Sequence, residues 1–190
     1  MKIENVVLMH NAREALNGNW GLAIAACIIY TLISGGFPMV GFILSGPMAT
    51  GMAIFSLKYA RRDRPELSQI FEGFNNFLNS LAAFLLMAVY IILWSLLLIV
   101  PGIIAAISYS QTFFILAEDR NIGPDDAINK SKKMMNGYKW KYFRLCLRFF
   151  GWGILCVFTL GIGFFWLVPW MQVTFAMFYD DIKNEAESER

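Results

Sequence analysis

The chain has 190 residues, of which 57% are hydrophobic and only 16% are charged. Soluble domains carry about 25% charged residues, so this composition is typical of a membrane protein rather than of a soluble domain. The net charge of +2 is too small to indicate nucleic acid as a partner. The three cysteines, an odd number without metal-ligand spacing, fit neither a disulfide framework nor a zinc site.

Charged residues are confined to four windows of the sequence, residues 2–14, 58–72, 118–148 and 180–190. The three segments between these windows carry no Asp, Glu, Lys or Arg, and each approaches the length of a transmembrane helical hairpin. All 16 Lys and Arg would therefore lie on one side of the membrane, which the positive-inside rule makes cytoplasmic. The pattern predicts a multi-pass protein of the cell (cytoplasmic) membrane with six spans, three hairpins and both termini inside.

The first hairpin is predicted over residues 20–34 and 39–59. A short helix at 4–17 precedes it, and Asn17-Gly18 can end that helix because glycine tolerates the left-handed cap. The reversal between the two spans is expected near Gly35-Gly36.

The second hairpin is predicted over residues 80–100 and 102–117, after an amphipathic helix at 66–78 that would lie in the headgroup layer. Pro101 lacks the N–H that a helix interior needs, and Gly102 permits a sharp reversal. Pro101-Gly102 is therefore predicted to be the tip of this hairpin.

The third hairpin follows a short helix predicted at 124–137. Its first span must begin within the preceding basic segment, because residues 149–179 alone are short for two spans. The turn is expected near 161–163 and the last span over 163–179. The acidic tail, 181–190, is expected to be frayed and cytoplasmic.

A repeat of about 60 residues emerges from this order, because Trp20, Ser80 and Trp140 each open a hairpin. The fold class predicted is an all-α polytopic membrane bundle of six transmembrane helices, with an amphipathic interfacial helix before each hairpin and pseudo-threefold symmetry. The predicted repeats are 1–60, 61–119 and 120–180, within a single transmembrane domain, 1–190.

Uncharged polar side chains form a layer near the middle of the predicted spans. Three of them are 61 residues apart, and a glutamine amide cannot be left unpaired in lipid, so we expect the layer to face inward around the pseudo-threefold axis. Two interpretations stay open: hydrogen bonds between helices, which we favour, and a polar cavity that holds a substrate. The residues are Thr50, Ser108, Ser110, Gln111, Thr112, Gln172 and Thr174, with Thr50, Gln111 and Gln172 as the spaced trio.

A basic stripe is predicted at the start of the fifth span. Lys141, Arg144 and Arg148 are spaced by three and four residues, so a helix places them on one face. Long basic side chains can snorkel toward anionic headgroups, and we hypothesise that this stripe contacts anionic lipid. The alternative is that these charges only fix the topology.

No catalytic, metal-binding or cofactor-binding motif is recognisable. His10 is the only histidine and lies outside the predicted spans, and no carboxylate pair falls within them. We therefore expect no enzyme and no cofactor. Two function classes stay open: a membrane module that associates with lipids or a protein partner, and a small transporter or channel with a polar cavity between the second, fourth and sixth spans.

A set of short segments in the second half of the sequence carries a resemblance to a known family. The segments are Pro101-Gly102-Ile103-Ile104, Tyr109-Ser110-Gln111-Thr112, Ile115-Leu116-Ala117, Ala127-Ile128 with Ser131, Met134-Met135-Asn136-Gly137, Lys139-Trp140 with Phe143, Gly151-Trp152, Thr159-Leu160-Gly161-Ile162-Gly163, Trp166, Pro169 and Phe178-Tyr179. Together they resemble a bacterial integral membrane family called domain of unknown function 975. The resemblance is dense over 100–180 and loose around Trp20, and it implies a multi-span membrane protein without catalytic residues. In some members a lysine stands at position 105 and a serine at position 148.

Overall fold

The computed structural model describes residues 3–35 and 38–188, and within that part of the chain it contains helices and no strand. The predicted all-α class is therefore confirmed. In chain order the helices are α1 Asn5–Leu16, α2 Trp20–Gly35, α3 Pro38–Ala60, the 3-10 helix η1 Leu67–Asn76, α4 Phe77–Leu97, α5 Ile99–Tyr109, α6 Thr112–Glu118, α7 Pro124–Met134, α8 Lys139–Phe158 and α9 Phe164–Ser188.

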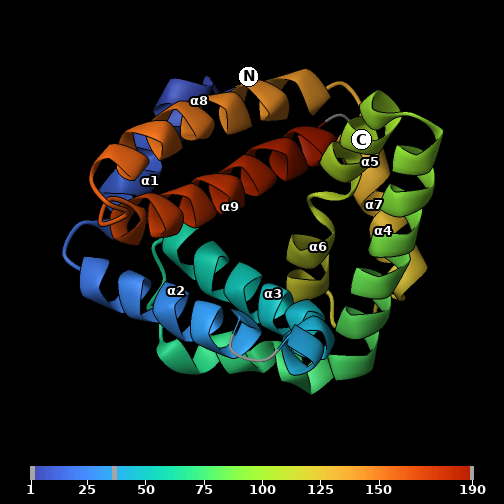
Figure 1. Ribbon diagram of the computed structural model, residues 1–190, viewed down its shortest axis with the longest axis horizontal. Coiled ribbons are helices and arrows are strands. Elements are labelled where there is room, and N and C mark those ends of the chain that lie inside the picture. Colours follow the sequence, from blue (N-terminus) through green and yellow to red (C-terminus); the bar gives the residue numbers. More distant parts are fainter. Residues whose placement is uncertain (1–2, 36–37, 189–190) are drawn as a thin grey trace.

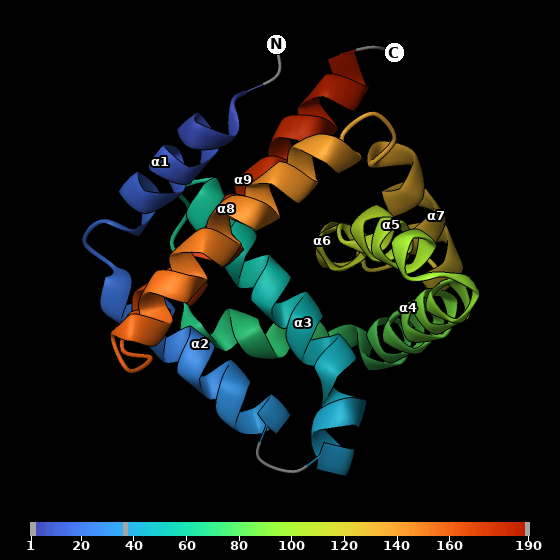
Figure 2. The same cartoon turned by 45° about the horizontal axis from the view of Figure 1, so that its top comes forward.

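Consecutive long helices pack against each other as hairpins: α2 with α3, α4 with α5, and α8 with α9 (Figure 1). A short helix precedes each pair along the chain, namely α1, η1 and α7. Helix α9 runs through the middle of the assembly, where it also contacts α1, α2 and α3. Figure 2 shows α1 and α2 on one side of the α8–α9 pair and α4 to α7 on the other.

The two short helices α1 and α7 end as the sequence predicts. Gly18 and Gly137 have φ angles of 88° and 84°, a left-handed conformation that residues with a side chain rarely adopt. The apolar face of α1 is buried, and the Trp170 indole N–H of α9 donates to the Met9 carbonyl of α1 at 2.7 Å. Helix α1 is therefore docked on α9.

The reversal of the second hairpin lies three residues before the predicted tip. Leu98 is extended, with φ −166° and ψ 147°, and it separates α4 from α5. Pro101 lies in the first turn of α5, where a missing N–H costs nothing. Gly102 faces Ser95 of α4 so closely that a Cβ atom would overlap it. The prediction of Pro101-Gly102 as the tip is wrong, and Gly102 instead permits close packing of α5 on α4.

The fourth predicted span is interrupted. Helix α5 ends at Tyr109, and α6 begins at Thr112. Ser131 of α7 bridges the interruption: its hydroxyl donates to the Ser108 carbonyl at 2.8 Å and accepts from the Gln111 N–H at 3.2 Å. Ser131 is fully buried, so α7 packs into the bundle and does not lie only at an interface.

The segment predicted at 66–78 forms η1 and the start of α4. It packs directly on α3, because Gly51 of α3 meets the backbone of Ile70 and Gly73 meets the backbone of Pro47 and Gly51. Ile70 is fully buried, whereas Phe71 is 47% exposed. The prediction that this segment lies in the headgroup layer missed this contact, which glycines on both elements make possible.

The third hairpin turns at the predicted place. Gly161 has a φ of 86° between the end of α8 and the start of α9. The tail predicted to be frayed instead continues α9 to Ser188, with Ile182 buried against α8 and α1 residues. The first predicted turn falls partly on Gly36, which lies outside the described residues.

Large apolar side chains are exposed where the second and third hairpins turn. Leu96 is 86% exposed, and Leu160 is 95% exposed. Two helical segments in the described chain are long and apolar enough to cross a membrane, 67–96 and 99–118. The bent pair of α1 and α2, with an angle of 100° between them, could form a third.

Candidate functional site: the charged face and the buried polar layer

The ends of α3 and α6 and the C-terminal part of α9 converge in a network of charged side chains, which we call the helix-end cluster: Arg61, Glu118, Tyr179, Asp180 and Lys183. The Arg61 guanidinium donates to Asp180 from Nε at 3.1 Å and from Nη2 at 2.7 Å, and Nη2 also contacts Glu118. The second oxygen of Glu118 accepts from Lys183 at 2.7 Å and from the Tyr179 hydroxyl at 2.8 Å. One arginine therefore joins the ends of α3 and α6 to the C-terminal part of α9.

The cluster is partly shielded from solvent. The Glu118 side chain is 17% exposed, and that of Asp180 is 22% exposed. The hydrogen bonds from Arg61 to Asp180 raise the pKa of the guanidinium above its ordinary value. Charge-assisted, two-bond contacts of this kind fix geometry better than a single lysine contact.

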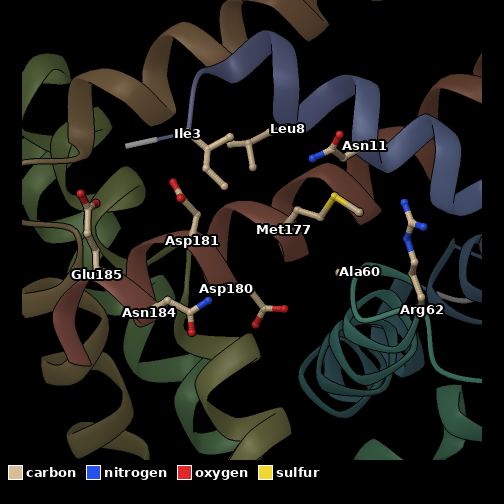
Figure 3. A pocket seen from close by; sticks show the side chains of 10 residues that line it. All are labelled: Ile3, Leu8, Asn11, Ala60, Arg62, Met177, Asp180, Asp181, Asn184 and Glu185. Carbon is tan, nitrogen blue, oxygen red and sulfur yellow. The ribbon is translucent and has the colours of Figure 1, made fainter. Parts of the chain in front are cut away.

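A polar pocket of about 490 Å³ opens beside the cluster, between α1, the end of α3 and α9 (Figure 3). Asp180, Asp181 and Glu185 project from α9 on one side, and Arg62 lies at the opposite end. A second polar pocket of about 580 Å³ is lined by Arg61, Glu118, Lys183 and residues nearby. We call the surface that carries the helix-end cluster, these two pockets and the basic residues at the start of α8 the charged face. This face presents open, polar depressions.

The three residues of the basic stripe have different environments in the structure. The Lys141 ammonium lies 2.6 Å from Asp181, with side chains only 11% and 5% exposed, and it also lies over the Phe178 ring at 5.6 Å. Lys141 is therefore paired within the protein and is not available to a lipid headgroup. This corrects the prediction that Lys141 is part of an exposed, lipid-contacting stripe. Arg144 and Arg148 are exposed, and within the described residues neither forms an ion pair.

Most of the polar layer is packed away from solvent. Gln111, Thr112 and Thr174 are fully buried, and Thr50 and Ser108 are at most 3% exposed. The remaining two members, Ser110 and Gln172, are half-buried.

Thr50 and Gln111, two members of the spaced trio, form hydrogen bonds with residues outside the trio. Thr50 donates to Gly46 at 3.2 Å and shares a 3.0 Å hydrogen bond with Ser80 of α4. The Gln111 amide donates to Ser110 at 2.9 Å, and its buried oxygen has no partner among the described residues. Thr174, a member of the layer outside the trio, donates back to its own helix at 2.7 Å. The Thr50–Ser80 hydrogen bond thus connects α3 with α4, and the Gln111 oxygen is left as an unused acceptor.

A family model described as "Protein of unknown function (DUF975)" matches residues 95–186. Residues 95–186 therefore belong to the DUF975 family. No curated protein matches the chain, and no solved structure matches it. The resemblance inferred from the sequence is confirmed, and the family's description names no function.

The DUF975 segment, 95–186, holds α5 to α8, most of α9, and every member of the helix-end cluster except Arg61. The cluster itself was missed by the sequence analysis. Arg61, Glu118 and Asp180 each follow or end an apolar segment, with separations of 57 residues from Arg61 to Glu118 and 119 from Arg61 to Asp180. Their shared position at the edge of an apolar segment is the feature of the sequence that could have predicted the cluster.

In residues 3–35 and 38–188, no three His, Cys, Asp or Glu side chains come together as a metal site. The acidic side chains of the DUF975 segment near the cluster are instead matched with Arg61, Lys141 or Lys183.

Proposed function

We propose that this chain is an integral protein of the cell membrane that crosses the bilayer six times as three hairpins, with the charged face and both termini in the cytoplasm. The exposed apolar side chains at the hairpin turns support this arrangement, because contiguous exposed apolar surface is unfavourable in water. Helix α4 has 21 residues, and about 20 helical residues cross a hydrocarbon core. The charges gather at the opposite end of the helices.

The proposal has six spans, whereas length and apolarity alone identify two or three candidate spans among the described residues. Helices α8 and α9 have 20 and 25 residues, and their charged residues lie in the first half of α8 and in the C-terminal part of α9. Such residues lower the average apolarity of a helix without preventing a crossing, since long basic side chains reach the headgroups. The order of short helix and hairpin, repeated along the chain, supports the pseudo-threefold relation.

Within this frame the protein acts as a non-catalytic membrane module that associates with lipids or with a protein partner through its charged face. One observation carries this proposal: the mid-span polar side chains are largely buried, whereas the charged face offers open polar pockets of about 390 to 580 Å³. Binding at that face needs no cofactor and no change in the bundle.

The topology is tested with reporter fusions after Glu66, Asp119 and Arg190. All three fusions are expected to report the cytoplasm, because the positive charges on one side fix the orientation. An external signal at any of the three would overturn the six-span arrangement. Affinity purification from native membranes, with lipids and proteins identified by mass spectrometry, then identifies what the charged face binds.

A small transporter or channel is the second candidate. The interruption between α5 and α6 favours it, because transporters often bind substrate at broken helices, and Gln111 carries an unused acceptor there. In that case Thr50, Gln111 and Gln172 would line a cavity between α3, the α5–α6 pair and α9.

Thiol labelling in membranes separates the two candidates. In a cysteine-free background, Gln111→Cys should resist a membrane-impermeant thiol reagent if the layer is packed, as its full burial indicates. Ile104→Cys, on the exposed apolar face of α5, is the lipid-facing control, and Asp119→Cys is the reactive control. Labelling at position 111 comparable to that at position 119 would favour the transporter.

A further inference from the structure

We infer that the groove between the start of α1 and the start of α8 binds the headgroup of an anionic phospholipid, with Arg144 and Arg148 holding its phosphodiester. This inference rests on the membrane orientation proposed above. The groove has a volume of about 390 Å³. Its walls are Ile3, Glu4, Asn5 and Val6 on one side and Gly137, Tyr138, Trp140, Lys141, Arg144 and Arg148 on the other.

The two arginines are arranged for one ligand. They are four residues apart on α8, so they are neighbours on one face, about 6 Å apart along the helix axis. Guanidinium groups match phosphate oxygens with paired hydrogen bonds, and both arginines are exposed. Their carboxylate competitor in the groove is Glu4, which forms no ion pair with either of them in the described structure.

The charges that line the groove favour a ligand with one negative charge. Lys141 is cancelled by Asp181 at 2.6 Å. Arg144, Arg148 and Glu4 then leave the groove with an excess of one positive charge. A phosphodiester with one negative charge neutralises this excess, whereas a zwitterionic headgroup leaves it in place.

The face of α8 continues from the arginines into an apolar surface, as a lipid requires. Gly151, Trp152 and Leu155 follow Arg148 at helical spacing, so they lie on the same face. Trp152 is 48% exposed and Leu155 is 56% exposed, and a Cβ at Gly151 would meet nothing within 4 Å. A free phosphate or an acidic peptide would use the arginines without this stripe, whereas a lipid places its acyl chain along it.

The α1 wall adds an unused acceptor. Asn5 is only 8% exposed, and its amide N–H₂ donates to the Lys141 carbonyl at 2.9 Å. Its amide oxygen has no hydrogen-bond partner among the described residues. A headgroup that carries hydroxyl donors, such as that of phosphatidylglycerol, can supply the missing donor between α1 and α8.

The test compares two double variants of the full chain that lose the same charge. Arg144→Gln with Arg148→Gln removes the groove cations, and Lys132→Gln with Lys133→Gln removes two exposed cations of α7 outside the groove. Each protein is placed in phosphatidylcholine nanodiscs with a fixed share of phosphatidylglycerol, and bound lipid is counted by native mass spectrometry. The same measurement with phosphatidylethanolamine or phosphatidic acid tests headgroup selectivity.

The groove variant should retain about thirtyfold less phosphatidylglycerol, about fivefold for each arginine, whereas the α7 variant should retain the normal amount. Equal losses in both variants, or no loss in the groove variant, would overturn the assignment. Glu4→Gln should raise retention, because it removes the negative charge that faces the phosphate, and an unchanged or lower retention would also count against the groove.

The membrane fraction and the cytoplasmic reporter of each variant are measured in parallel. A groove variant that stays in the membrane with normal topology and normal lipid retention defeats this inference alone. A protein that fails to enter the membrane, or shows an external reporter signal, defeats the proposed function as well.

Discussion

Arg61 and Asp180 are 119 residues apart in the sequence, and the guanidinium of Arg61 donates two hydrogen bonds to the Asp180 carboxylate, at 3.1 and 2.7 Å. Because Arg61 also contacts Glu118, this one side chain holds the ends of α3 and α6 against the C-terminal part of α9. The residues of the buried polar layer lie on or beside the same three helices, together with α5. The cluster therefore closes the bundle on its charged side.

Replacing Arg61 by Gln is expected to lower the free energy of unfolding by about 0.4–2 kcal/mol. Each partly exposed ion pair contributes about 0.2–1 kcal/mol, and Arg61 takes part in two. Thermal unfolding in a mild detergent measures the loss. Arg62→Gln is the matched control, because the Arg62–Glu14 pair is 3.7 Å long with both side chains at least half exposed. Equal stability of the two variants would refute a joining role for Arg61.

The buried pair of Lys141 and Asp181 predicts a stronger and non-additive effect. Removing one partner, as in Lys141→Met, leaves a buried charge alone and should cost about 3–5 kcal/mol. Removing both, as in Lys141→Met with Asp181→Leu, should cost clearly less than the sum of the single changes. Chemical unfolding of the four members of this cycle measures the coupling. Additive losses would show that the two side chains do not act as a pair.

Backbone contact between η1 and α3 gives a third prediction. Gly51→Ala and Gly73→Ala each place a Cβ into opposing backbone, so each should destabilise the protein by about 1–3 kcal/mol. Gly153→Ala is the control, because it lies inside α8 with nothing within 4 Å, and alanine there should be neutral or stabilising by up to about 1 kcal/mol. Equal unfolding temperatures for all three variants would show that the folded protein does not keep η1 this close to α3.

The sequence predicts helix positions well because charge windows and glycine caps are local signals. Gly18 and Gly137 end the helices they were expected to end, and the third hairpin turns at Gly161. Proline was a poor guide to the second turn, because Pro101 is tolerated in the first turn of a helix as readily as between helices.

The candidate sites were harder to predict, because they depend on partners far along the chain. The sequence places Lys141 in an exposed basic stripe, but Lys141 is buried because it pairs with Asp181, 40 residues away. The interruption between α5 and α6 follows from a buried hydroxyl on a third helix, and no local feature of Ser110 or Gln111 signals it. Only the three-dimensional arrangement supplies these partners.

The Ser131 bridge yields the last prediction. Its hydroxyl satisfies two backbone groups that the interruption exposes, the Ser108 carbonyl at 2.8 Å and the Gln111 N–H at 3.2 Å. Alanine leaves both groups unpaired in a fully buried place. Each unsatisfied group costs about 1–3 kcal/mol, so Ser131→Ala should lower the free energy of unfolding by about 2–6 kcal/mol. Ser45→Ala is the control, because that hydroxyl only bonds back to its own helix at 2.7 Å. Hydrogen exchange provides a second measurement, since the Gln111 amide should exchange faster in Ser131→Ala than in the control. An unchanged exchange rate together with unchanged stability would mean that the backbone at the interruption finds other partners.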